Sequence, residues 1–104
     1  MITGTESSPE NVNESVPVLK LDATLGSFIT IEWKKSGFDA LELQYRKAGT
    51  EMWQAADKST EKIIEFQPTG TIPGTPEKYE FRAVFLQKNQ RVGQWSAIYS
   101  ITIG

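Results

Sequence analysis

The stretch Phe28-Ile-Thr-Ile-Glu-Trp33 decides the fold, because its large apolar side chains recur at every second position. In an extended strand, successive side chains point to opposite faces. Ile29, Ile31 and Trp33 therefore share one face, and the polar residues between them lie on the other. This alternation predicts a β-strand with one buried and one solvated face.

Six further runs with the same alternation lie on either side of this strand. They cover Val18–Leu21, Leu41–Arg46, Met52–Gln54, Lys62–Gln67, Tyr79–Leu86 and Ser96–Ile103. The best helix candidate, Ala55–Lys62, has no large apolar residue that could form a buried stripe. Seven short strands separated by polar turns predict an all-β fold in which two antiparallel sheets pack into a sandwich.

The composition excludes several classes of chemistry. The 104 residues include no His and no Cys, so the chain has no imidazole base, no thiolate nucleophile, no zinc or iron–sulfur ligand set and no disulfide. The 11 basic and 13 acidic residues give a net charge of −2, which argues against a nucleic-acid binder. No apolar stretch approaches the ~20 residues that span a bilayer. We therefore predict no cofactor, no metal and no membrane insertion.

The first 16 residues differ in composition from the rest. They are rich in Ser, Thr, Asn and Glu, and they contain three acidic residues and no basic one. Such a segment buries too little apolar surface to offset the entropy of ordering it. We interpret residues 1–16 as a flexible linker or cloning remnant, with docking of Ile2 or Val12 on a sheet edge as the alternative. Residues 17–104 form the predicted domain.

Several motifs in residues 17–104 resemble the fibronectin type III family. In chain order they are Ile29-x-Ile31-x-Trp33, Leu43-x-Tyr45, Pro73-Gly74-Thr75, Tyr79-x-Phe81 and Gly93-x-Trp95-Ser96. The corner before Tyr79 is about two residues longer than is usual in that family. Residues 87–92, which we expect to form a loop, contain no Arg-Gly-Asp motif, so integrin binding is not implied.

The resemblance implies a seven-stranded, immunoglobulin-like sandwich without enzymatic activity. Similar domains are accessory modules of larger cell-surface or secreted proteins, among them bacterial carbohydrate-active enzymes and adhesins and animal receptors. By resemblance, the expected role is that of a monomeric spacer or protein-interaction domain outside the cell. Its expected partners are neighbouring domains, with a protein or a glycan as a further possibility.

The inward positions of the strands form the predicted core, and aromatic residues dominate it. The residues assigned to it are Ile29, Ile31, Trp33, Leu43, Tyr45, Tyr79, Phe81, Ala83 and Ile101. Trp33 ends an alternating strand, so we interpret it as a packing residue between the sheets rather than as a ligand-stacking one.

Trp53, Trp95 and Arg82 are the candidate ligand contacts. The two tryptophans lie near strand ends, where a ring covers the sheet rim or presents a face to a ligand. Arg82 lies on the outward face of its strand and is favoured over Arg46 as the cation–π partner of Trp95. Two exposed rings on one face would make the chain a carbohydrate-binding module, which is the alternative function.

Three further possibilities stay open from the residues alone. Glu32 and Glu42 lie on outward faces of strands that could be neighbours, where we expect solvated cross-strand ion pairs rather than a catalytic pair. The outward-facing Val84 and Leu86 could form an apolar patch with Ile98 and cause self-association. Residues 93–96 also resemble half of the tryptophan–serine motif of cytokine receptors, which would make the chain a receptor-like module.

Overall fold

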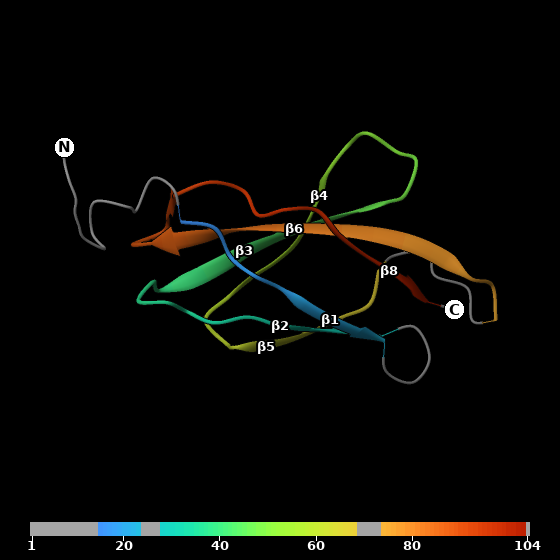
Figure 1. Cartoon of the computed structure of the whole chain (residues 1–104), viewed down its shortest axis with the longest axis horizontal. Coiled ribbons are helices and arrows are strands. Elements are labelled where there is room, and N and C mark those ends of the chain that lie inside the picture. Colours follow the sequence, from blue (N-terminus) through green and yellow to red (C-terminus); the bar gives the residue numbers. More distant parts are fainter. Residues whose placement is uncertain (1–14, 24–27, 69–73, 104) are drawn as a thin grey trace.

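The structure is a computed structural model that describes residues 15–23, 28–68 and 74–103. In these ranges the chain forms eight strands and no helix. The strands are β1 (Lys20–Ala23), β2 (Ile29–Glu32), β3 (Ala40–Lys47), β4 (Gln54–Ser59), β5 (Ile63–Phe66), β6 (Glu77–Gln87), β7 (Gln90–Val92) and β8 (Tyr99–Ile103) (Figure 1).

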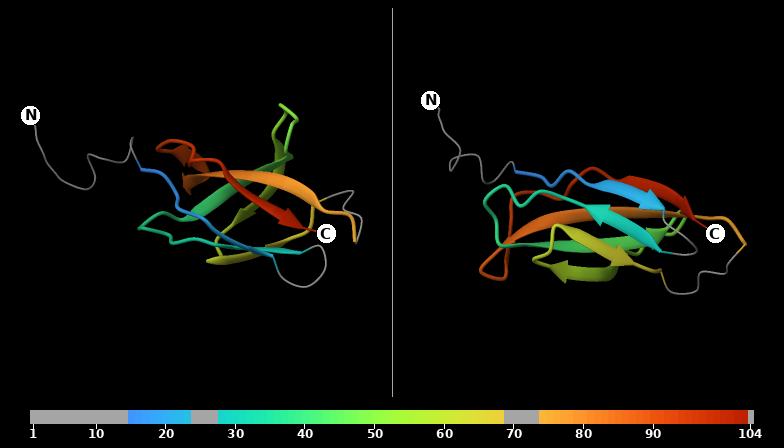
Figure 2. Two further views of the ribbon diagram at one scale, coloured as in Figure 1. Left: turned by 45° about the vertical axis from the view of Figure 1, so that its right-hand side comes forward. Right: turned by 90° about the horizontal axis from the view of Figure 1, so that it is seen from below.

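The strands form two antiparallel sheets that face each other in two layers (Figure 2). One sheet has the order β1-β2-β5, and the other has the order β4-β3-β6-β7 with β8 also paired to β6. Strand β6 pairs with β3 along most of its length on one side. On its other side, β7 pairs with its last residues and β8 with its first ones. The predicted all-β fold with two antiparallel sheets is confirmed.

Strand β4 differs from the sequence prediction. It was expected at Met52–Gln54, but it covers Gln54–Ser59 and so occupies most of the segment considered as a helix. Its side chains are mostly exposed, so its sequence carries no alternation of apolar and polar residues that would predict a strand. Main-chain pairing with β3 holds it in place, with a register shift opposite Leu43 and Gln44.

A second difference is the extra strand β7, in a segment that was expected to be a loop. Lys88 and Asn89 have φ values of 51° and 65°, so together they make a two-residue turn that folds β7 back onto β6. The carboxylate of Asp39 supports this turn by accepting a hydrogen bond of 2.9 Å from the main-chain N–H of Lys88. A strand of only three residues, preceded by a turn without glycine, has no sequence pattern from which it could be predicted.

The core lies between the sheets, and Trp33 is its largest fully buried side chain among the described residues. The Trp33 side chain is 2% exposed, and its indole Nε1–H donates a 2.6 Å hydrogen bond to the carbonyl of Glu61. Eight of the nine expected core residues are buried, and Ile101 is partly buried and packs against them. Phe85 adds a ring that stacks on Phe38 with centroids 4.4 Å apart.

The apolar patch expected at Val84, Leu86 and Ile98 does not form. Val84 and Leu86 are buried, and only Ile98 is exposed, at 52%. Val84 is paired with Glu42 on β3 and Leu86 with Arg91 on β7. Glu42 and Arg91 are joined by an ion pair, which therefore spans β6 and covers the two apolar side chains.

Some of the sequence predictions fall outside the described residues. These include Ile2, Val12 and most of the predicted linker, as well as Pro73 of the corner. Within the described part, the carbonyl of Ser15 accepts a 3.0 Å hydrogen bond from the main-chain N–H of Gln94. Pro17 is fully buried. Ser15, two residues before the predicted boundary, thus already contacts the sandwich.

Replacing Trp33 tests whether this ring is central to the fold. We expect Trp33→Ala to lower the free energy of unfolding by about 3–5 kcal/mol, because the change removes a fully buried aromatic ring. Chemical denaturation of both proteins, followed by far-ultraviolet circular dichroism, measures the difference. Met52→Ala is the matched control, since Met52 is 78% exposed and its loss should change stability by less than about 0.5 kcal/mol.

Candidate functional site

The outer face of the five-stranded sheet carries an alternating series of arginine and tryptophan side chains. We call it the arginine–tryptophan stack: Arg46, Trp53, Arg82, Trp95 and Arg91. Strands β3, β6 and β7 supply the arginines, while the tryptophans lie just before β4 and just after β7. This position follows from the alternation, because Tyr45 before Arg46 and the two residues that flank Arg82 are buried in the core.

Cation–π contacts connect the five side chains in order. The guanidinium carbons of Arg46 and Arg82 lie 4.2 Å and 4.6 Å from the ring centroid of Trp53. Those of Arg82 and Arg91 lie 4.1 Å and 5.1 Å from the centroid of Trp95. Arg82 thus contacts both rings and is the central member of the stack.

Hydrogen bonds from neighbouring strands fix the orientation of each guanidinium group. Arg46 Nε donates to Glu80 Oε1 at 2.7 Å, and Arg82 Nε donates to Gln44 Oε1 at 2.9 Å. Arg91 makes two bonds of 2.8 Å to the two carboxylate oxygens of Glu42. Such planar, bidentate pairing is specific to arginine and holds the group flat against a ring.

The charges of the stack are compensated unevenly. Glu80 and Glu42 neutralise the outer two arginines, whereas the side-chain partner of Arg82 is the neutral Gln44. Burial lowers the pKa of Arg82, and the positive charges of the two other arginines lower it further. The hydrogen bond from Arg91 holds the pKa of Glu42 below its usual value, against the opposing effect of burial.

The structure brings all three predicted ligand contacts together. Arg82 stacks on Trp95 as predicted, whereas Arg46 stacks on Trp53. Both rings are only partly exposed and each has two guanidinium groups over it. A role of these side chains in ligand contact stays a prediction. Sequence reasoning missed Arg91, because its position depends on the unexpected strand β7.

The two carboxylates considered as a pair are far apart in the fold. Glu32 lies on β2 in the three-stranded sheet, whereas Glu42 lies on β3 in the five-stranded sheet, so the expectation that their strands are neighbours is wrong. Glu42 is buried beneath its bonds to Arg91 rather than solvated. Arg46 and Lys47 of β3 form their cross-strand ion pairs with other carboxylates than these two, namely those of Glu80 and Glu77 on β6.

Residues 15–23, 28–68 and 74–103 bring together no group of three or more acidic side chains that could hold a metal ion. Within the same ranges, none of the chain forms a helix long and apolar enough to cross a membrane.

Replacing Arg82 tests whether the stack stabilises the domain. We expect Arg82→Ala to lower the free energy of unfolding by about 1–2 kcal/mol, because two cation–π contacts and one hydrogen bond are lost. Urea denaturation followed by tryptophan fluorescence measures both the stability and the environment of the rings. Lys78→Ala, an exposed change on the same strand, should have little effect. Equal stability of the two variants would show that the contacts contribute nothing.

The ion pair of Glu42 predicts a pH dependence. Because the pKa of Glu42 in the folded state lies below its ordinary value of 4.5, its ionised form stabilises the fold above that pH. This stabilisation is lost as the pH falls through the lower folded-state pKa. We therefore expect the unfolding free energy of the wild type to fall more steeply below about pH 5 than that of Glu42→Gln.

Urea titrations at several pH values between 7 and 3 measure this difference. Glu65→Gln, which removes an exposed carboxyl group from the other sheet, should leave the slope close to that of the wild type. If Glu42→Gln left the pH dependence of the unfolding free energy unchanged, that result would contradict the assigned role of the Glu42–Arg91 pair.

Similar solved structures exist, although no family model and no curated protein sequence matches the chain. The twitchin kinase region from C. elegans, which includes the units Fn31 and Ig26, matches with a TM-score of 0.67 and 18% identity. The match covers 88% of this chain and 17% of that one. A crystal structure of domains from titin matches with a TM-score of 0.57 and 13% identity, covering 83% of this chain and 31% of that one.

The chain thus spans less than a third of the length of each of these proteins. At such low identity the similarity shows the fold alone: an immunoglobulin-like or fibronectin type III-like β-sandwich, an architecture that occurs as one domain of larger chains.

Proposed function

We propose that the chain is a non-catalytic, fibronectin type III-like module of a larger protein and holds its neighbouring domains apart. The observation that carries this proposal is the path of the chain through the sandwich. It enters beside Gln94, which lies level with the stretch of β6 between Ala83 and Phe85, and leaves along the start of β6, where Ile103 is paired with Glu77. Figure 1 shows the two ends of β6 at opposite ends of the molecule.

Strand β6 sets the separation between those two points. The seven residue steps from Glu77 to Val84 span roughly 23 Å at about 3.3 Å per residue. Neighbours attached at the two ends would lie in line with the module between them. A sandwich packed through a continuous core resists bending, so it would keep this separation better than a flexible linker of equal length.

The fibronectin type III assignment rests on the sequence motifs, whose residues occupy core and turn positions in the fold. Trp33, Tyr45 and Tyr79 are buried in the core, and Gly93 adopts a φ of 76° before Trp95. The structural neighbours support a modular domain with an immunoglobulin-like or fibronectin type III-like fold, without deciding between the two. Placement outside the cell rests on the family resemblance alone, and so does the monomeric state.

A carbohydrate-binding role is less well supported. A sugar ring stacks on the same face of an indole that a cation–π partner uses, and a guanidinium group occupies that position over each of the two rings. Binding would require an arginine to leave its hydrogen-bonded partner on a neighbouring strand. The arrangement therefore favours a structural role for Trp53 and Trp95.

A fusion protein tests the spacer role. The full chain is placed between two fluorescent proteins, and single-molecule energy transfer reports the distribution of their separation. We expect a narrower distribution than that of a 104-residue Gly/Ser linker, whose root-mean-square length is on the order of 55 Å. A distribution as broad as that of the linker would overturn the proposal.

Affinity electrophoresis in soluble polysaccharides tests the alternative. Retardation of the wild type that is lost in a folded Trp53→Ala or Trp95→Ala variant would replace the spacer proposal with carbohydrate binding. Unchanged mobility in all three proteins is the result that the stacked guanidinium groups predict.

A further inference from the structure

The three-stranded sheet has an open edge at β5. Strand β5 is paired with β2 on one side, and within the described residues no strand is paired with its other side. The main-chain N–H of Trp33 donates to the carbonyl of Lys62 at 3.0 Å. In an antiparallel ladder, hydrogen-bonded residue pairs alternate with pairs that are not hydrogen-bonded, so Ile63 and Glu65 belong to pairs that are not bonded to β2. Main-chain groups of Ile63 and Glu65 therefore point away from β2, toward the open edge.

The other long edges of the described sandwich are less accessible to a new strand. Strand β4 has a register shift in its pairing with β3, and such an irregularity discourages further pairing. Strand β1 packs alongside β8 of the opposite sheet. The edge at β5 has a regular register and neither of these protections.

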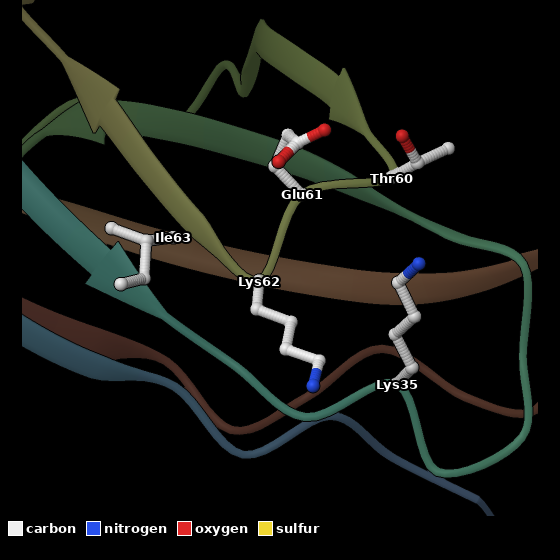
Figure 3. A pocket seen from close by; sticks show the side chains of 5 residues that line it. All are labelled: Lys35, Thr60, Glu61, Lys62 and Ile63. Carbon is white, nitrogen blue, oxygen red and sulfur yellow. The ribbon is translucent and has the colours of Figure 1, made fainter.

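A pocket of about 380 Å³ lies at the start of this edge. Its lining residues are Lys35, Thr60, Glu61, Lys62 and Ile63 (Figure 3). The side chains of Lys35 and Lys62 come from the β2–β3 loop and from the residue before β5, and neither makes an ion pair within the described residues. Figure 3 shows the carboxylate of Glu61 directed away from the ammonium group of Lys62.

An apolar side chain adjoins the two lysines on the same edge. Ile63 is 57% exposed, although it lies within a strand. The edge thus offers free main-chain hydrogen-bonding groups, an apolar contact and a pair of positive charges within a few residues. These are the features by which an extended peptide is recognised when it adds as a strand to a sheet.

We propose that β5 binds an extended acidic peptide, which pairs with the main chain of Ile63 and Glu65 and places a carboxylate between Lys35 and Lys62. Charge complementarity selects this occupant, because two unpaired ammonium groups at the end of an open edge favour an anionic group. An apolar residue of the peptide packs on Ile63. The proposal holds whether or not the chain acts as a spacer.

The carboxylate could come from an acidic side chain or from the end of a peptide, and synthetic peptides distinguish the two. The first probe is acetyl-Thr-Val-Glu-Val-Thr-Val-amide, and its control carries Gln in place of Glu. The second probe is acetyl-Thr-Val-Thr-Val with a free carboxyl end, and its control is the corresponding amide. Because these controls alter only the peptide, they are independent of the stability of any protein variant.

Titration of the isotopically labelled full chain, followed by amide NMR shifts, locates and measures binding. We expect the largest shifts at Ile63 and Glu65, with weak affinity in the range of about 0.1–1 mM. The carboxylate of at least one probe should raise affinity by about five- to tenfold over its neutral control. Equal affinity for both members of each pair would overturn the proposal, as would shifts confined to another surface or no binding up to about 2 mM.

Protein variants test the assigned residues. Lys35→Met and Lys62→Met should each reduce binding of the acidic probe about five-fold, whereas Lys34→Met, next to the pocket but not lining it, should not. Ile63→Pro should abolish binding and keep the fold, because the lost N–H points away from β2. Unchanged binding in Ile63→Pro would contradict strand addition.

A second copy of the chain is the competing occupant. Concentration-dependent shifts of Ile63 and Glu65 in the absence of peptide would show that this edge mediates self-association, and would overturn the peptide proposal. A spectrum independent of protein concentration, together with carboxylate-dependent peptide shifts, is the expected result.

Discussion

The position of Trp33 between the two sheets is the constraint on which the rest of the structure depends. Without cysteine, the sandwich has no covalent cross-link, so packing of the two inner faces must hold it together. Trp33 contributes the largest fully buried side chain to that packing. It also fixes the start of β5, because its indole and main-chain N–H groups donate to the carbonyls of Glu61 and Lys62. The same residue thus secures the core and positions one side of the lysine pocket.

The outer face of the five-stranded sheet follows a different physical rule. On β6, Phe81 and Phe85 point into the core, whereas Arg82 and two buried apolar residues point to the other side. There, arginine side chains stacked on tryptophans cover what would otherwise be exposed apolar surface, with their charged groups paired across neighbouring strands. The candidate ligand contacts Trp53, Arg82 and Trp95 thus stack on one another and on their neighbours and stabilise the sheet. This arrangement favours a structural role for them.

The sequence was sufficient to predict the sheets but insufficient to predict their edges and outer surface. Strands with one buried face, such as β2 and β6, carry an alternation that follows directly from burial. Strand β4 has no such signal, since it is an exposed edge strand held by main-chain bonds. The Glu42–Arg91 bond joins residues 49 apart in sequence, and it depends on the register of three strands and on a turn with two positive φ values. Even so, the outward position of Arg82 was enough to predict its stacking on Trp95.

Native-state hydrogen exchange tests the central claim, which is that one packed core holds the sandwich while the edge at β5 stays open. The account predicts that amides of Phe81 and Ala83 exchange only through global unfolding. The amides of Ile63 and Glu65, whose N–H groups point to the open edge, should exchange much faster than that of Ile64, which faces β2. Equal protection of these three amides, or exchange of the β6 amides through local opening far below the global free energy of unfolding, would contradict the account.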